Sequence, residues 1–299
     1  MLTDVHVAVI GGDARQLEVI QKFSELDATV TLIGFDRWQP PYSGVTKAEL
    51  SPKILAEADV VMLPVVGTDD NGVVECLFSD AEIVLLEEHL AALPKHAVVY
   101  TGMAKPYLKK ICLKHDIKLI ELLDRDDVAI YNSIPTAEGA VMMAIQNTDI
   151  TIHGSVSMVL GLGRTGLTLA RTLKGLGAHV KAGVRRHEQF ARAWEMGFAP
   201  FYMEELARQV TNIDLLFNTV PTMIITAQII ANLPSRAVII DLASKPGGTD
   251  FRYAEKRGVK ALLAPGLPGI VAPKTAGRII ANAVSELIME DVRKGRIAQ

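Results

Sequence analysis

The chain has 299 residues, which is enough for two domains of ordinary size, each with its own hydrophobic core. Nearly half of the residues are hydrophobic (49%) and only 5% are aromatic, which is typical of α/β proteins rich in small aliphatic side chains. The net charge of −3 argues against nucleic acid as a partner, because there is no general basic field to attract phosphates. An anionic ligand would have to be met by a local group of arginine and lysine side chains.

Other classes of protein are disfavoured by the residue types and their spacing. The two cysteines, Cys76 and Cys112, form no CxxC pair, so we expect a reducing, cytoplasmic compartment. The seven histidines are scattered without metal-ligand spacing, so no metal site is predicted. No apolar run is long enough to span a membrane, and the first twelve residues read as a strand leading into glycines rather than as a signal peptide.

Short runs of β-branched and aliphatic residues alternate with amphipathic stretches along the whole chain, which predicts parallel sheets covered by helices. The expected strands are 6–10, 28–33, 59–64, 97–100 and 117–122 in the first half, and 157–161, 179–184, 213–218, 237–241 and 259–264 in the second. The second set repeats the order of the first. The predicted fold class is therefore α/β, with two doubly wound Rossmann-like domains and the main cleft between them.

Local signals predict where several helices begin and end. Ser79 and Glu82 form a capping box, which predicts a helix over 83–93. Gly177 is expected to end a helix that begins near Thr165.

Two further helices define the predicted domain organisation. A connecting helix is expected over 134–148, with Thr136 as its N-cap. The segment from about Lys274 to Arg293 is helical in pattern and has no strand after it, so we expect it to return to the first domain. The predicted organisation is a flavodoxin-like N-terminal substrate domain over 1–135 plus 280–299, a connecting helix over 136–149, and a nucleotide-binding domain over 150–275.

The strongest motif is a glycine-rich turn between an expected strand and an expected helix. It reads GLGRTG and comprises Gly161, Leu162, Gly163, Arg164, Thr165 and Gly166. Gly161 permits a tight turn, Gly163 lets the backbone approach a pyrophosphate, and Gly166 lets the helix and the strand pack closely. Because the helix N-terminus would face the phosphates, we expect these six residues to bind a dinucleotide. A glycine-rich turn without a ligand is the alternative.

The strand over 179–184 should end beside the adenosine ribose, where a carboxylate would select NAD. Arg185 and Arg186 stand there instead. A guanidinium pairs well with a 2′-phosphate, and the strand end has no carboxylate to repel it, so both arginines favour NADP as the cofactor. The alternatives are NAD and a pair of solvated arginines.

Two later strand ends should border the nicotinamide half of the cofactor, because doubly wound sheets bind ligands at their carboxyl edge. Thr219, Val220 and Pro221 follow the strand over 213–218, and Ala243 follows the next strand. We expect these four residues to contact the cofactor, although ordinary loop structure would also account for them.

The first domain has a weaker turn, GGDARQ (11–16), which lacks a third glycine at the required spacing. A second dinucleotide is therefore not expected. The turn favours a small anion held by backbone N–H groups and Arg15, and a solvated Arg15 at a tight turn is the alternative.

Several stretches resemble the A subunits of bacterial dipicolinate synthase, over nearly the whole chain. They are IGGDARQ (10–16), GLGRTG (161–166) with the following VRR, NTVP (218–221), DLASKPGG (241–248) and APGLPGIVAPKTAG (264–277). GGDARQ and PGLPGIVAPKTAG are more specific than GLGRTG, which many families share. The resemblance implies an NADP-dependent dehydrogenase subunit that oxidises a dihydrodipicolinate-type precursor to pyridine-2,6-dicarboxylate. It places the reaction at the end of a branch from lysine (diaminopimelate) biosynthesis, in the mother cell of a sporulating bacterium.

The resemblance also implies a partner and a fold. The partner is a flavoprotein-like B subunit, so the chain would belong to a hetero-oligomer. The fold would be similar to that of the formate/glycerate dehydrogenase group, with the cofactor in the second domain.

A substrate with two carboxylates needs two cationic or N–H anchors held apart. The candidates at loops and helix starts are Arg15, Lys105, Thr136, Lys245, Lys274 and Thr275. Each could instead be solvated, as surface lysines usually are. No histidine is placed by the sequence to act as a base, so the catalytic residue is left unassigned.

Two other functions stay open. A 2-hydroxy-acid dehydrogenase would share the architecture, but such enzymes carry an arginine where this chain has Lys245, and a histidine near 264–269, where it has none. A non-catalytic NADP-binding subunit of a flavoprotein complex would show the same cofactor motif.

Overall fold

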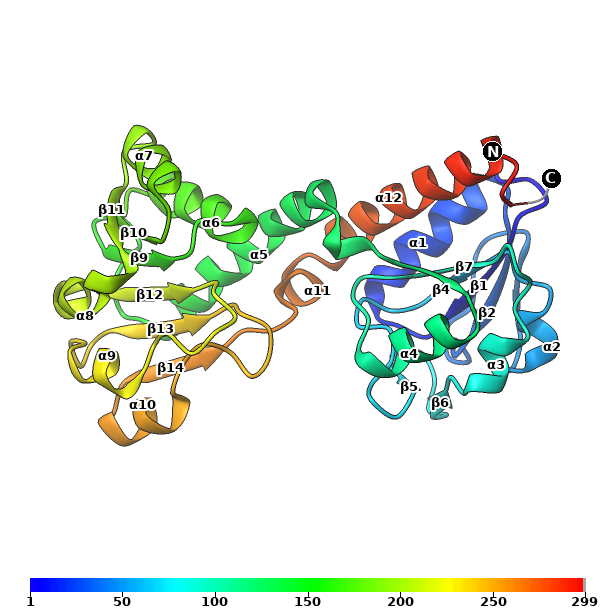
Figure 1. The fold of residues 1–299 in the computed structure, drawn as a ribbon, viewed down its shortest axis with the longest axis horizontal. Helices are drawn as coiled ribbons and strands as arrows, with labels where there is room; N and C mark the ends of the chain where they lie inside the picture. Colours follow the sequence, from blue (N-terminus) through cyan, green and yellow to red (C-terminus); the bar gives the residue numbers. More distant parts are fainter. Residues whose placement is uncertain (298–299) are drawn as a thin grey trace. The chain divides into compact units, whose positions relative to one another are not determined.

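The computed structural model describes residues 1–297, which form two compact units (Figure 1). Unit 1 comprises Met1–Val128 and Pro273–Gln299, and unit 2 comprises Ala129–Ala272. Residues 298–299, the end of the predicted range 280–299, lie outside the described part of the chain. Unit 1 is therefore built from two stretches of sequence, with the whole of unit 2 inserted between them.

Unit 1 contains a six-stranded sheet in the order β3-β2-β1-β4-β7-β8, and all of its strands are parallel. The strands are β1 (His6–Ile10), β2 (Thr29–Ile33), β3 (Val45–Lys47), β4 (Val60–Met62), β7 (Val98–Thr101) and β8 (Lys118–Glu121). Without the short edge strand β3, the order is that of flavodoxin-like sheets. A separate antiparallel pair is formed by β5 (Val73–Val74) and β6 (Ile83–Val84).

Both faces of this sheet are covered, because successive residues of a buried strand point to opposite sides. On β1, Val7 and Val9 belong to one apolar core, and Ala8 and Ile10 belong to the other. The first core includes side chains of α1 (Ala14–Glu25) and α12 (Pro273–Arg293). The second includes side chains of α2 (Pro52–Leu55), α3 (Glu87–Ala91) and α4 (Pro106–Lys114). The last helix of the chain thus completes the core of unit 1.

Unit 2 contains a second six-stranded parallel sheet, in the order β11-β10-β9-β12-β13-β14. The strands are β9 (Val156–Leu160), β10 (His179–Val184), β11 (Ala199–Tyr202), β12 (Leu215–Asn218), β13 (Val238–Asp241) and β14 (Lys260–Leu263). This order is that of Rossmann sheets, and it reverses between β9 and β12. The predicted α/β class with two doubly wound sheets is confirmed.

Helices also cover both faces of the second sheet, which explains why its strands are almost continuously apolar. One core includes side chains of α5, α6, α7 and α11, and the other includes side chains of α8, α9 and α10. Their bounds are α5 Asp126–Asn147, α6 Arg164–Gly175, α7 His187–Glu195, α8 Leu206–Gln209, α9 Ala227–Ala231, α10 Phe251–Arg257 and α11 Leu267–Val271. Gly177, with φ of +84°, follows the end of α6 as predicted.

The connecting helix begins earlier than the sequence indicated. Helix α5 runs through Pro135, so the prediction of a helix that starts at 134 with Thr136 as its N-cap is wrong. The Thr136 hydroxyl donates a 2.8 Å hydrogen bond to the Asn132 carbonyl oxygen, and the Ser133 hydroxyl donates one of 2.6 Å to that of Ile130. The two side chains flank Pro135, and both bond carbonyl oxygens of the turn before it, so hydroxyl groups supply hydrogen bonds in the turn where the proline has no N–H to donate.

The predicted capping box at Ser79 and Glu82 is also wrong. Residues 83–93 divide into β6 and the short helix α3 instead of forming one helix. The Ser79 hydroxyl donates to the Asp36 carboxylate, which follows β2, and accepts a 3.1 Å hydrogen bond from the Ala81 amide. A contact distant in sequence therefore overrides the local signal.

No helix of residues 1–297 is both long enough and apolar enough to cross a membrane.

Candidate functional site

The glycine-rich turn of unit 2 lies between the end of β9 and the start of α6. Gly161 has φ of +86°, a conformation that side chains disfavour. A Cβ on Gly166 would lie only 1.9 Å from the Gly161 carbonyl oxygen, so helix and strand can approach this closely only at a glycine. A Cβ on Gly163, by contrast, would meet nothing within 4 Å. The open space in front of Gly163, at the N-terminus of α6, is where a pyrophosphate would approach, so these residues fit a dinucleotide.

Two neighbouring strands hold this turn in place. The Gly161 amide donates a 2.9 Å hydrogen bond to the Gly183 carbonyl oxygen on β10. The Thr219 hydroxyl, just after β12, donates one of 2.8 Å to the Leu160 carbonyl oxygen. Thr219 is thus fixed directly beside the turn, at the point where the strand order reverses.

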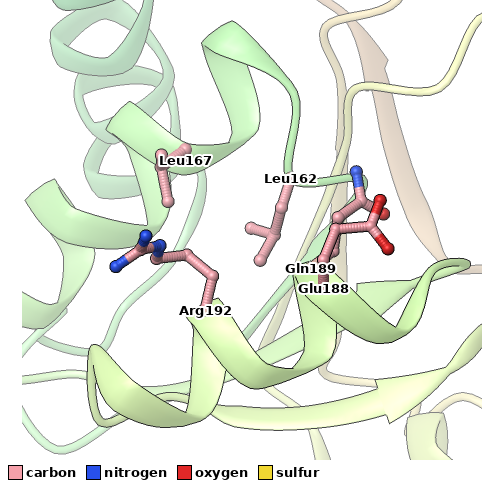
Figure 2. A pocket seen from close by; sticks show the side chains of 5 residues that line it. All are labelled: Leu162, Leu167, Glu188, Gln189 and Arg192. Atoms are coloured by element: carbon pink, nitrogen blue, oxygen red, sulfur yellow. The ribbon is translucent and has the colours of Figure 1, made fainter.

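A pocket of about 270 Å³ lies beside the glycine turn, between α6 and α7 (Figure 2). Its lining residues are Leu162, Leu167, Glu188, Gln189 and Arg192. Two leucines supply apolar walls for a flat ring, and three polar side chains surround them. In a Rossmann fold this position, between the first glycine turn and the segment after the second strand, belongs to the adenosine half of a dinucleotide.

Four of these lining residues were not predicted from the sequence. Leu167 lies on α6, directly after the last glycine of the motif, and Glu188, Gln189 and Arg192 lie on α7. Glu188 and Arg192 are four residues apart and share a face of the helix. That spacing, directly after the end of β10, is the signal that would have found them.

Arg185 and Arg186 follow Val184, the last residue of β10, and both are exposed. The Arg186 Nε atom is 2.9 Å from the Glu188 carboxylate, in a pair whose side chains are each about two-thirds exposed (67% and 64%). The expectation that no carboxylate would stand near these arginines is therefore wrong, because Glu188 is supplied by the next helix. Arg185 takes part in none of the hydrogen bonds or ion pairs among residues 1–297.

The segments after β12 and β13 are tied together by Asn218 and Asp241, which pair across the two strands. Both side chains are fully buried, and the Asn218 amide donates a 3.0 Å hydrogen bond to the Asp241 carboxylate. The predicted cofactor residues Val220, Pro221 and Ala243 follow them on the two loops. The structure thus places both loops at the same edge of the sheet as the glycine turn.

In unit 1, the turn after β1 also requires glycine, since Gly11 and Gly12 have φ of +58° and +111°. Asp13 is the N-cap of α1, and its carboxylate accepts hydrogen bonds from the amide and the guanidinium of Arg15. Burial alone would raise the pKa of Asp13, but the bonds from Arg15 outweigh it and leave this pKa below its ordinary value. Arg15 is consequently held in one orientation over the start of the helix.

The start of α12 lies against the start of α1. A Cβ on Gly277 would be 2.5 Å from the Arg15 carbonyl oxygen, so the two helices meet closely there. Lys274 and Thr275 occupy the exposed first turn of α12. The structure therefore brings three predicted substrate residues, Arg15, Lys274 and Thr275, to two adjacent helix N-termini.

A residue missed by the sequence reasoning stands at the same place. The side chain of Gln16 is 3% exposed and folds over Gly12, and its amide nitrogen is buried without a hydrogen-bond partner among the described residues. Only the position of Gln16 in GGDARQ would have pointed to it.

The other three predicted substrate residues lie elsewhere. Lys105 precedes α4 and is 3.9 Å from the Asp70 carboxylate, at the same edge of the first sheet. In unit 2, Thr136 lies within α5, bonded to its own helix, and Lys245 is exposed in the loop after β13. Among residues 1–297, no group of three or more histidine, cysteine or acidic side chains could hold a metal ion.

Comparison with known proteins shows which family the chain belongs to. Residues 6–123 match the family model for the N-terminal domain of the dipicolinate synthase A subunit. The A subunit of dipicolinate synthase from Bacillus subtilis (strain 168) is 51% identical over 290 residues, which cover 97% of this chain and 98% of that protein. The chain belongs to the family of dipicolinate synthase A subunits. The crystal structure of the Bacillus halodurans member is 52% identical, with a TM-score of 0.94, over 96% of this chain and 99% of that one.

The second half of the chain matches a wider family. Residues 129–298 match the model of the alanine dehydrogenase/PNT C-terminal domain, so the chain carries an oxidoreductase domain that binds a nicotinamide dinucleotide. The transhydrogenase of Sinorhizobium meliloti has the same fold, with a TM-score of 0.69 at 15% identity over 97% of this chain and 96% of that one. The glycine turn and the pocket beside it both lie inside the matched region.

Proposed function

We propose that this chain is the NADP-dependent dehydrogenase subunit of a dipicolinate synthase, and that it oxidises a dihydrodipicolinate-type precursor to pyridine-2,6-dicarboxylate. The observation that carries the proposal is the contact between Arg15 and Gly277. It brings GGDARQ and APKTAG, the two stretches most specific to the family, to one place in unit 1. Those stretches supply cations and helix N-termini, which are what a carboxylate requires.

The proposed reaction requires the protein mainly to orient the substrate and the cofactor and to neutralise the charge of the substrate. The dihydropyridine ring gives up a hydride and a ring proton, and it becomes aromatic, which drives the reaction forward. The bound nicotinamide supplies the hydride acceptor. The residues of the chain would hold both molecules in place and neutralise the two carboxylates, and a modest base would suffice for the proton.

Several side chains are proposed as substrate anchors. Arg15, Lys274 and Thr275 would bind one carboxylate at the paired helix N-termini, and the buried Gln16 amide is a further donor beside them. The remaining proposed anchors are Lys245, which is exposed, and Lys105 and Thr136, which are half-buried. Of these, Thr136 already donates its hydroxyl within α5 and can offer a ligand only its oxygen lone pairs.

The preference for NADP rests on the two arginines at the end of β10. Arg185 would bind the 2′-phosphate directly, since its guanidinium is exposed beside the adenosine pocket. Arg186 would contribute after exchanging its partner, Glu188, for the phosphate. The cofactor contacts along the rest of the site would come from the GLGRTG turn, Thr219, Val220, Pro221 and Ala243.

The family name denotes one subunit of a synthase, which supports a partner chain. We propose that this partner is a flavoprotein-like B subunit, that the active form is a hetero-oligomer, and that it works in the cytoplasm of the mother cell during sporulation. Neither a membrane nor nucleic acid has a place in this proposal.

The purified chain, given the precursor and NADP⁺, tests the proposal. Absorbance that appears at the wavelength of reduced nicotinamide, together with dipicolinate, would support a catalytic subunit. Turnover only after the B subunit is added would identify the chain as a cofactor-binding subunit. Turnover of 2-hydroxy acids with no dipicolinate formed would contradict the proposed substrate.

A further inference from the structure

The carboxylate of Asp241, at the end of β13, is fully buried and accepts four hydrogen bonds. Its Oδ1 atom accepts from the Asn218 amide nitrogen (3.0 Å) and from the Ala243 backbone amide (3.1 Å). Its Oδ2 atom accepts from the Gly248 amide (2.8 Å) and from the Thr249 hydroxyl (2.6 Å). Donors face both oxygens, which is the arrangement that a carboxylate, acting only as an acceptor, requires.

The network extends through Asn218 to the loop after β12. The Asn218 side-chain oxygen accepts a 3.0 Å hydrogen bond from the Val220 amide, and its nitrogen donates one of 3.1 Å to the Val220 carbonyl oxygen. The loop that begins at Val220 and the loop over 243–248 are therefore both fastened to one buried charge. Doubly wound sheets hold the nicotinamide half of a dinucleotide at these two strand ends.

The charge of Asp241 is not neutralised by a neighbouring cation. None of the ion pairs among residues 1–297 includes it, and its four donors are all neutral. Burying an anion without a cation raises the free energy of the folded protein, even when hydrogen bonds satisfy it. In a poorly polarisable interior, its field also reaches further than that of a surface carboxylate. A group of this kind at a cofactor site suggests a function beyond fastening loops.

We propose that Asp241 makes this site bind the oxidised nicotinamide cofactor in preference to the reduced one. The nicotinamide ring carries a positive charge when oxidised and none when reduced. A buried anion beneath the loops that contact the ring attracts only the oxidised form. Asp241 is a positioning residue that fixes the two loops, and its charge sets the balance between the two forms of the cofactor.

This preference suits the proposed reaction. Aromatisation supplies enough driving force to reduce a cofactor that is held more firmly in its oxidised form. Asp241 would attract the neutral reduced ring less than the charged oxidised ring, so the site would favour replacement of the reduced cofactor by an oxidised molecule. The inference depends on the nicotinamide cofactor of the family but not on the identity of the substrate.

Dissociation constants for NADP⁺, NADPH, NAD⁺ and NADH, measured by calorimetry on the full chain without substrate, test the inference. The wild-type protein should bind the oxidised form of each pair more tightly than the reduced form, by about tenfold. Asp241→Asn, which keeps the shape and removes the charge, should abolish that ratio. Thr249→Val is the matched control: it removes one hydrogen bond to the same carboxylate and keeps the charge, so the ratio should stay as in the wild type.

Three results would overturn the inference: a wild-type protein without preference for the oxidised forms, an Asp241→Asn protein that keeps the wild-type ratio, or an equal change of ratio in Thr249→Val. A wild-type protein without that preference overturns the inference even if Asp241→Asn does not fold. Using both pairs of cofactors separates this result from the choice between NADP and NAD. Because no substrate is added, it is also independent of the activity assay.

Discussion

The Nζ atom of Lys118, on β8, lies 2.8 Å from the Asp291 carboxylate near the end of α12, and so links two segments that are 173 residues apart in the sequence. Arg296 is 3.1 Å from the other carboxylate oxygen. Asp291 is 4% exposed, whereas its two partners are about half exposed. This contact fastens the last helix to the edge of the sheet in unit 1.

The pKa of Asp291 leads to a prediction about how the stability of the fold changes at acid pH. Burial alone would raise this pKa, but the bonds from Lys118 and Arg296 outweigh it and keep it below its ordinary value. A carboxylate whose pKa is lower in the folded state stabilises the fold above its unfolded pKa, and this contribution is lost as the pH falls through the folded pKa. Asp291→Asn should therefore reduce the free energy of unfolding by about 1–2 kcal/mol at pH 7, discounted for the exposed partners.

Urea unfolding of both proteins at several pH values would measure this effect. The difference between wild type and Asp291→Asn should shrink as the pH falls below about 4. A difference that stays constant down to pH 2 would show that the ion pairs of Asp291 contribute nothing.

The glycine turn predicts opposite effects for two neighbouring substitutions. Gly163→Val places its side chain in open space, so the free energy of unfolding should change by less than about 1 kcal/mol while nucleotide binding is lost. Gly166→Ala would force a Cβ against the Gly161 carbonyl oxygen and should cost about 2–3 kcal/mol of stability. Thermal unfolding and cofactor titration of each variant would check both effects. Undiminished cofactor binding by Gly163→Val would remove the turn from the proposed cofactor site.

The two arginines after β10 predict cofactor specificity. Changing Arg185 to Asp and Arg186 to Ala together should weaken NADP binding by about 100-fold and leave NAD binding nearly unchanged. Glu188→Gln, which frees Arg186 from its ion pair, should instead strengthen NADP binding several-fold. Fluorescence titration with both cofactors distinguishes these cases. Equal losses of NADP and NAD in the double variant would contradict binding of the 2′-phosphate.

Lys274, at the start of α12, is predicted to bind the substrate and not the cofactor. Lys274→Ala should raise KM for the dicarboxylate by about tenfold, with the dissociation constant of NADP unchanged. Lys294→Ala is a suitable control, because Lys294 follows the other end of the same helix and pairs with Glu290. Steady-state kinetics with both variants would measure the effect. An unchanged KM in Lys274→Ala would exclude this lysine from the substrate site.

The sequence predicted the features that depend on local chemistry. The long apolar strands were found because burial on both faces demands them, and GLGRTG was found because its glycines are fixed by backbone geometry. Four strands were missed. The edge strands β3 and β11 are only partly buried, and β5 and β6 have two residues each, so none of them carries a continuous apolar run.

Features that depend on distant contacts were not predictable from the sequence. The Ser79 hydroxyl bonds Asp36 instead of capping a helix, and α5 continues through Pro135 with help from nearby hydroxyl groups. In the candidate site, Glu188 lies on the next helix and pairs with Arg186, which the sequence did not indicate. Asp241 was interpreted only as part of a loop motif, and its buried hydrogen bonds were not predicted. Each of these depends on which neighbours the fold supplies.

The insertion of unit 2 into unit 1 has a consequence for the order in which the chain is made. As the protein leaves the ribosome, every strand and helix of unit 2 has been synthesised by Ala272, so its sheet and its covering helices can assemble at once. The first sheet emerges much earlier, but α1 lacks its neighbour until Pro273–Arg293 follows. Until then, the apolar side chains that pack against α12, such as Phe23, have no cover on that side. The synthesis of unit 1 therefore begins first, but its core is completed only after unit 2 has been made.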